Sequence, residues 1–137
     1  MDKADNVQNY LIFISHSSED SWVAEQIAGE LQIRGISTFL FETDIEFRAD
    51  FEEKLRDTLE KADELLVLLT PWALERRYVW LEIGAAWLRK IPIASVLHGL
   101  KPEKLQSDPN FPILLKKSNM ITLNQISRYF DQLSNIR

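Results

Sequence analysis

Short apolar runs alternate along the chain with longer segments in which apolar residues recur every three or four positions. Residues 10–14 and 65–69 are continuous β-prone runs, which are typical of strands buried on both faces. Residues 36–41 form another short run, and residues 92–97 form a further one, with proline tolerated at its start. We therefore predict four strands in the first hundred residues.

Segments with helical spacing separate these strands. Residues 17–20 offer capping oxygens, and an apolar face at Val23, Ile27 and Leu31 follows until Gly35 stops the helix. The next helix is predicted to be capped by Asp50 with Glu53, and its apolar face consists of Phe51, Leu55, Leu59 and Ala62. A third helical segment spans residues 78–90.

The last forty residues carry a weaker pattern. Residues 101–112 resemble a loop, residues 120–123 an edge strand, and residues 125–133 a closing helix that packs through Ile126, Tyr129, Phe130 and Leu133. The alternation predicts an α/β fold: a flavodoxin-like three-layer sandwich with a central parallel five-stranded sheet flanked by helices. We expect a single domain over residues 1–137, with a flexible N-terminus at residues 1–7.

The carboxyl ends of the strands are where such a sheet binds ligands, near the point at which the strand order reverses. A site is therefore expected in the loops after Ile14, Phe41, Leu69 and Leu97.

Composition excludes several classes of protein. The 137 residues carry a net charge of −5, which argues against nucleic-acid binding, because that function needs a basic surface. The absence of cysteine excludes disulfides, thiolate zinc sites and a cysteine nucleophile. The polar N-terminus and the short apolar runs argue against a signal peptide and a membrane span, so we expect a cytoplasmic domain.

Glu82 is the most informative residue. It is the only charged residue between Tyr78 and Leu88, in a helical segment that is apolar nearly all round, and such a helix is covered on most faces by the core or by a partner. Tyr78 lies one turn before Glu82, and Ala85 and Ala86 lie one turn after it, which predicts open space beside the carboxylate. A ligand pocket is one interpretation; the other is a structural pair, in which Glu82 bonds to Arg76, Arg77, Arg89 or a nearby amide.

The segment from Ser15 to Ser18 follows the first strand and precedes a helix, where hydroxyls and backbone N–H groups bind anions well or simply cap the helix. No glycine-rich phosphate loop and no hydrolase elbow motif occurs in the chain. The two histidines lack metal-ligand spacing, and the acidic residues Glu42, Asp44 and Glu46 are better explained as a solvated loop than as a Mg²⁺ site, so no metal is expected.

Taken in order, four segments resemble the Toll/interleukin-1 receptor (TIR) domain, particularly its bacterial members. They are residues 10–20, residues 36–45, residues 62–71 and residues 78–86, and the last resembles the family's W-x-x-x-E-[IL] helix with Tyr78 in place of tryptophan. The match is clearest over residues 8–100. The loop that usually carries Gly or Pro before paired acids reads Glu46–Asp50 here, without either residue.

The resemblance implies an enzyme that cleaves the nicotinamide–ribose bond of NAD⁺, with Glu82 as its catalytic glutamate. NAD⁺ is then a substrate, and no cofactor is needed. Substrate-binding positions by the same resemblance are Ser15, His16, Ser17, Ser18, Phe41, Asp44 and Tyr78. Phe47 and Arg48 are expected in the loop that meets a neighbouring TIR domain.

Other functions remain open at this point. A TIR scaffold that only recruits other TIR domains is the main alternative, and it has no need of a carboxylate in an apolar helix. A deoxyribosyltransferase-like enzyme also uses a glutamate on a similar sheet. A response-regulator receiver is disfavoured, because Ser15 and His16 stand where an acidic pair is needed.

The expected partners are NAD⁺, further copies of the TIR domain and a separate sensor or effector protein, with neither nucleic acid nor membrane. In a bacterial setting the resemblance suggests anti-phage immune signalling. The product (ADP-ribose, a cyclic isomer or a base-exchange product), the activating signal and the source organism do not follow from the sequence.

Overall fold

The computed structural model describes residues 10–42, 49–116 and 119–134, which form five strands and the helices around them. The strands are β1 (Leu11–His16), β2 (Ser37–Glu42), β3 (Glu64–Leu69), β4 (Ile93–Leu97) and β5 (Asn119–Thr122). The α-helices are α2 (Ser21–Ile33), α3 (Ala49–Lys61), α4 (Arg77–Arg89), α5 (Pro102–Ser107), α6 (Ile113–Lys116) and α7 (Ile126–Ser134). Single 3₁₀ turns, η1 (Ser18–Asp20), η2 (Ala73–Glu75) and η3 (Leu123–Gln125), precede α2, α4 and α7.

The sheet is parallel throughout, with strand order β2-β1-β3-β4-β5. The predicted three-layer α/β sandwich is confirmed. The order reverses between β1 and β3, so the carboxyl ends of these two strands form the switch point at which a ligand site is expected.

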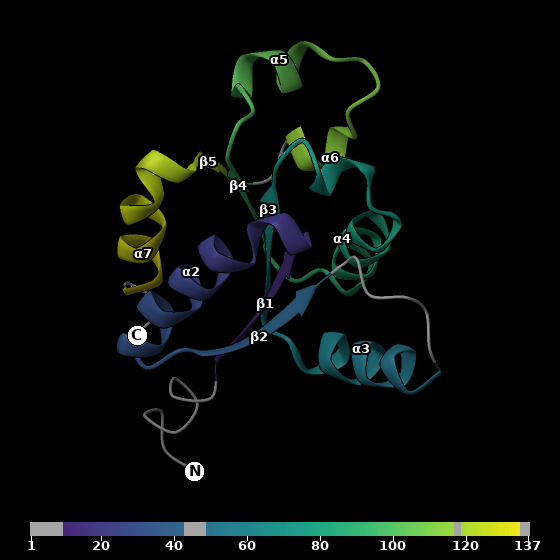
Figure 1. Cartoon of the computed structure of the whole chain (residues 1–137), viewed down its shortest axis with the longest axis vertical. Helices are drawn as coiled ribbons and strands as arrows, with labels where there is room; N and C mark the ends of the chain where they lie inside the picture. The colour runs from purple at the N-terminus through teal and green to yellow at the C-terminus, as the bar shows by residue number, and fades with distance from the viewer. Residues whose placement is uncertain (1–9, 43–48, 117–118, 135–137) are drawn as a thin grey trace.

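Each face of the sheet has its own apolar core, because side chains of a strand alternate between faces. In Figure 1, α2 and α7 lie on one side of the sheet, and α3 and α4 lie on the other. Phe13, Leu65 and Val67 belong to the core under α3 and α4, whereas Ile12, Ile14 and Leu66 belong to the core under α2 and α7. All six residues of β3 are buried, as a strand covered on both faces requires.

The predicted elements occur close to their expected positions, with three corrections. The capping prediction for residues 17–20 is wrong: no side chain caps the start of α2, and η1 takes up this segment. Asp50 is not the residue before the second helix, which begins at Ala49. The segment predicted as a loop at residues 101–112 contains α5, because Pro102 at its first turn is compatible with a helix.

Other local predictions are confirmed. Gly35 has a φ of 81° directly after α2, a conformation that favours glycine and ends the helix. Leu55, Leu59 and Ala62 are buried under the sheet, and so are Tyr129, Phe130 and Leu133 of α7. The side chain of Phe51 and residues 1–7 lie outside the described residues. Among the described helices, none is long and apolar enough to cross a membrane.

A buried carboxyl lies at the amino end of the sheet, and each of its two oxygens accepts a hydrogen bond. Glu64, the first residue of β3, accepts hydrogen bonds from the Tyr10 hydroxyl (2.7 Å) and from the Tyr129 hydroxyl of α7. Burial raises the pKa of Glu64, while the two tyrosine hydrogen bonds oppose that shift. These contacts connect α7 and the start of β1 to the central strand, so they hold the two ends of the described chain together.

We expect Tyr129→Phe to lower the free energy of unfolding by about 1–3 kcal/mol, because one oxygen of a buried carboxyl loses its donor. Urea denaturation at neutral pH measures the change. Tyr10→Phe removes a hydrogen bond that is only partly buried and should cost less. A Tyr129→Phe variant as stable as the parent chain would contradict this account of the cluster.

Candidate active site

A row of side chains crosses the sheet near the carboxyl ends of the strands. In the parallel register Phe41 lies beside Ser15, Ser15 beside Val67, and Val67 beside Ser95. Neighbours in register point to the same face, and Phe41 and Val67 place this row in the core under α3 and α4. Ser15 and Ser95 are therefore two hydroxyls in an otherwise apolar layer, and both are completely buried.

Helix α4 covers this layer and carries Glu82 on its inner face. It contacts β1, β3 and β4, with Val79, Glu82, Ile83 and Ala86 buried. Glu82 is 0% exposed, and neither of its carboxyl oxygens has a hydrogen-bond partner. The open space expected beside this group stays a prediction.

The ion-pair interpretation of Glu82 is wrong. Arg76 forms a salt bridge with Glu19 at 3.4 Å, and Arg89 donates to the backbone carbonyls of Leu59 (2.6 Å) and Ala62 (3.0 Å). No arginine within the described residues forms an ion pair with Glu82. The carboxyl group is thus buried without a compensating cation, an arrangement that costs free energy when the group is ionised.

Burial raises the pKa of Glu82 to about 8, and the nearby Ser15 hydroxyl opposes the shift only in part. Ser15 is close enough to influence the carboxyl, but no hydrogen bond of regular geometry joins the two side chains. At neutral pH Glu82 is therefore mostly a neutral acid, because its surroundings disfavour the ionised form.

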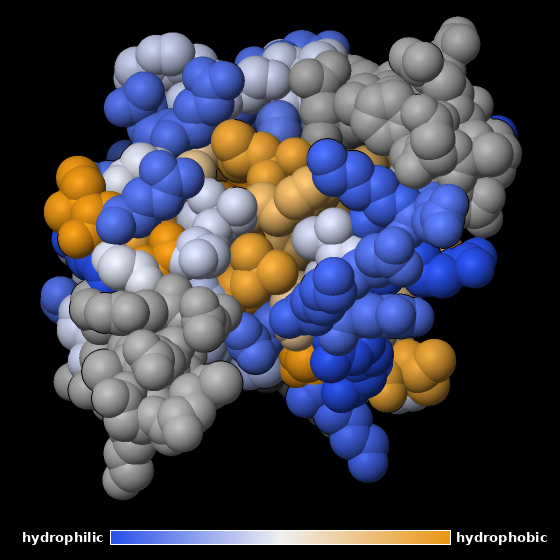
Figure 2. Space-filling view, turned by 90° about the horizontal axis from the view of Figure 1, so that it is seen from below, coloured by the Kyte–Doolittle hydropathy of each residue, from blue (hydrophilic) through white to orange (hydrophobic). Residues whose placement is uncertain are grey.

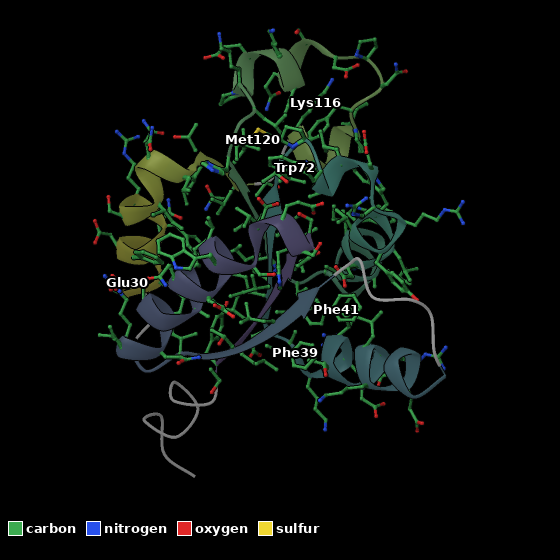
Figure 3. All side chains as sticks on the ribbon, in the orientation of Figure 1. Glu30, Phe39, Phe41, Trp72, Lys116 and Met120 are labelled. Carbon is green, nitrogen blue, oxygen red and sulfur yellow. The ribbon has the colours of Figure 1, made fainter. Side chains whose placement is uncertain are left out.

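An aromatic wall lies next to this acid. Tyr78, one turn before Glu82, meets the ring of Phe41 edge to face, with 5.6 Å between centroids. Phe41 also packs against the ring of Phe13, with 5.9 Å between the ring centroids. Figure 3 shows Phe41 near the carboxyl end of β2, beside α3 and α4, with Phe39 earlier in the same strand. Tyr78 is half-buried, so one part of this wall is accessible to a ligand.

The loops after β1 and β3 are joined through a second buried carboxylate. Asp20 accepts hydrogen bonds from the Ser17 and Thr70 hydroxyls, both at 2.6 Å. Thr70 in turn accepts a hydrogen bond from the backbone N–H of Ala73 at 3.1 Å. All three polar side chains are buried, so this network fixes the relative position of the two loops at the switch point.

The structure brings together only part of the predicted substrate-binding set. Ser15, His16 and Ser17 are buried at the end of β1 and just beyond it, whereas Ser18 is exposed and its hydroxyl donates to Glu19 at 3.3 Å. Ser17 already donates to Asp20. Asp44, Phe47 and Arg48 lie outside the described residues, so their roles stay predictions.

Sequence reasoning missed Asp20, Thr70 and Ser95 as parts of this site. Each carries a detectable signal: Asp20 lies three residues after Ser17, Thr70 directly ends an apolar strand, and Ser95 interrupts another. In the described parts of the chain, no group of three His, Asp or Glu side chains is placed to hold a metal ion.

Comparison with known proteins agrees with this fold. A family model described as the TIR domain matches residues 12–136. The TIR domain of the Toll-related receptor TRR-2 from the lower metazoan Hydra magnipapillata has a TM-score of 0.64 and 16% identity, over 89% of this chain and 96% of that chain. The TIR domains of the activated Roq1 resistosome, which directly recognises the pathogen effector XopQ, have a TM-score of 0.58 and 12% identity. This match covers 93% of this chain and 83% of that chain.

No curated protein matches the chain. At these identities the solved structures show a shared fold, while the family model extends over nearly all the described residues. The chain belongs to the TIR domain family.

Proposed function

We propose that this TIR domain is an NAD⁺ nucleosidase that cleaves the bond between nicotinamide and ribose, with Glu82 as its catalytic residue. The observation that carries the proposal is the state of Glu82: a fully buried carboxyl with no hydrogen-bond partner, at the level of the carboxyl ends of β1 and β3. A purely structural carboxyl would be expected to have donors, as Glu64 and Asp20 do.

The reaction needs a negative charge more than a proton donor. Nicotinamide in NAD⁺ is cationic, so when its bond to ribose breaks, the electron pair leaves with the ring nitrogen and the ring becomes neutral. The positive charge moves to the ribose as an oxocarbenium ion, which an ionised carboxylate in a dry site stabilises strongly. Water then adds to this ion and releases a proton, giving ADP-ribose; attack by a group of the substrate itself gives a cyclic product.

Glu82 suits this role because its environment makes its charge responsive to the substrate. A cationic substrate beside the buried group favours the ionised form and lowers its pKa. Tyr78 and Phe41 offer ring faces and edges to a planar base, and Ser15 supplies a hydroxyl close to the carboxyl. Since Glu82 is enclosed, substrate entry requires the packing above it to open, and contact with another TIR domain or a separate activating protein is our proposed trigger.

A non-catalytic scaffold for homotypic TIR association is the second candidate. The enclosed position of Glu82 favours it, because the carboxyl is inaccessible in this conformation. Both candidates are compatible with cytoplasmic immune signalling, including defence against phage. The experiments below separate them, because only the enzyme releases nicotinamide.

We expect Glu82→Gln to reduce nicotinamide release from NAD⁺ by about 10²-fold or more, since a preorganised negative charge is lost. The measurement is chromatographic detection of nicotinamide at high protein concentration. Asn124→Gln, on the exposed turn η3, is the matched control and should retain full activity.

The Glu82→Gln variant also tests whether burial raises the pKa of Glu82. Glutamine needs no proton to stay neutral, so the parent chain should lose stability relative to Glu82→Gln as pH rises from about 4.5 to about 8, and the difference should then level off. Full turnover by Glu82→Gln would remove Glu82 from the mechanism, whereas a parent chain that releases no nicotinamide would leave the scaffold.

The pH dependence of kcat/KM should have a rising limb with an apparent pKa near 8, because the ionised form of Glu82 is the active one in the free enzyme. Initial rates between pH 6 and 9, corrected for the reaction without enzyme, measure it. A profile that falls over this range would indicate that Glu82 acts as an acid and would contradict the proposed step.

Tyr78→Ala should raise KM for NAD⁺ more than Tyr78→Phe does, because the ring supplies the contact surface and its hydroxyl has no assigned role. Steady-state kinetics of both variants, each checked for an unchanged thermal transition, give the comparison. Equal damage from both substitutions would point instead to a hydrogen bond from the hydroxyl.

A further inference from the structure

A small cavity lies between α7 and the sheet, away from the candidate active site. It has a volume of about 180 Å³. Its lining comes from the starts of β3, β4 and β5 and from α7: Glu64, Pro92, Ile93, Ala94, Asn119, Tyr129, Gln132 and Leu133. Figure 1 shows α7 beside β5 at one side of the molecule. The cavity therefore opens at the amino ends of the strands, whereas Ser15 and Glu82 lie toward the carboxyl ends.

The carboxyl of Glu64 is the charged group of this cavity. Its hydrogen-bond donors are the hydroxyls of Tyr10 and Tyr129, and no Lys or Arg within the described residues forms an ion pair with it. A carboxylate has about four lone-pair sites, so it can accept further donors. Burial raises the pKa of Glu64, and only these two neutral hydroxyls oppose the shift. A cation beside this carboxyl would thus supply the charge that the fold itself does not provide.

The mouth of the cavity adds a polar group and no positive charge. Asn119 and Gln132 are both exposed there, and the Asn119 amide donates to the Gln132 carbonyl at 2.9 Å. This hydrogen bond leaves the carbonyl oxygen of Asn119 as an acceptor. The lining contains no Lys, Arg or His, and the chain as a whole carries a net charge of −5. The site therefore favours a cation over an anion.

The remaining lining is apolar and aromatic. Pro92, Ile93, Ala94 and Leu133 provide the apolar surface, and the ring of Tyr129 is a surface that attracts cations. The lower face of the molecule is mixed in the same way, with apolar side chains between strongly hydrophilic ones (Figure 2). The volume is well below the roughly 300–1,000 Å³ of sites for drug-sized ligands, so the ligand has to be smaller than a nucleotide.

We propose that this cavity binds a small organic cation, in which a primary ammonium group donates to Glu64 and a short apolar chain packs on Ile93 and Leu133. The ammonium has three donors, which suit the carboxylate and the carbonyl of Asn119. A bare metal ion fits less well, because the described residues contain no group of three His, Asp or Glu side chains placed to hold one. The apolar lining also lacks the oxygen ligands that such an ion requires.

The proposal does not depend on NAD⁺ cleavage, and its test reads binding alone. The whole chain is titrated with n-butylammonium chloride at constant ionic strength and followed by NMR. The side-chain amide signals of Asn119 and Gln132 should shift and reach saturation, because both groups lie at the mouth. n-Butanol has a similar size without the charge and should bind about 10-fold or more weakly, since a hydrogen bond between charged groups is lost. Sodium chloride alone should shift neither signal.

Two variants change the charge at the cavity in opposite directions. Glu64→Gln removes the charge at nearly constant shape and should weaken n-butylammonium binding by about 10-fold or more. Gln132→Glu adds a carboxylate at the exposed mouth and should tighten binding by about 2- to 5-fold, the scale of an exposed ion pair. Because Gln132 is exposed, its substitution keeps the test valid even where Glu64→Gln fails to fold.

Gln26→Glu is the matched control for Gln132→Glu. It makes the same change of net charge at an exposed position of α2, outside the lining of the cavity, and should leave the Kd for n-butylammonium unchanged. Circular dichroism and thermal unfolding establish that each variant is folded.

Three results would each overturn the proposal. If n-butanol binds as tightly as n-butylammonium, the cavity selects an apolar chain and not a cation. If Gln26→Glu tightens binding as much as Gln132→Glu does, the cation is attracted by the acidic surface as a whole. If the amide signals of Asn119 and Gln132 show no saturable shift with n-butylammonium, the cavity does not bind an ammonium group.

Discussion

The central strand β3 is buried along its whole length, and most of the architecture follows from covering it. Helices must lie on both faces of the sheet, so the alternating side chains of β3 divide between two cores. On one of these faces α4 has to cross β1, β3 and β4, and its inner residues become part of the core. The carboxyl of Glu82 is thereby placed over the Ser15 hydroxyl in an apolar layer, at the switch point of the sheet.

Three buried carboxyl groups in this fold differ in their hydrogen-bond partners. Glu64 accepts hydrogen bonds from two tyrosines, and Asp20 accepts them from Ser17 and Thr70. Both groups bind together segments that are distant in sequence. Glu82 has no such partners, and burial raises its pKa to about 8. Stability alone does not account for an acid kept in this state, since a neutral side chain of similar size would cost less. This contrast is the physical basis for the proposed catalytic role.

The two faces of α4 connect the site with the surface. One face holds the acid in the core, and the opposite face presents Leu81, Trp87 and Leu88 to the solvent. Because Leu81 and Glu82 are neighbours in the helix, a protein that docks on the outer face acts on the same rigid element that positions the carboxyl. The exposed face of α4 and the buried carboxyl therefore belong to one rigid helix.

The local patterns of the sequence determined the fold class and the position of most elements. Continuous apolar runs identified four strands, and the isolated charge in residues 78–88 singled out Glu82, because periodicity and the cost of burying a charge are local properties. The helix α5 escaped prediction, since its six residues carry too few apolar positions to show a period. Only the tertiary structure decided that Glu82 has no ion pair, that Asp20 and Thr70 share a hydrogen bond across fifty residues, and that half of α4 stays uncovered. Such contacts depend on strand register and on the packing of helices over the sheet, which bring together residues that no local pattern relates.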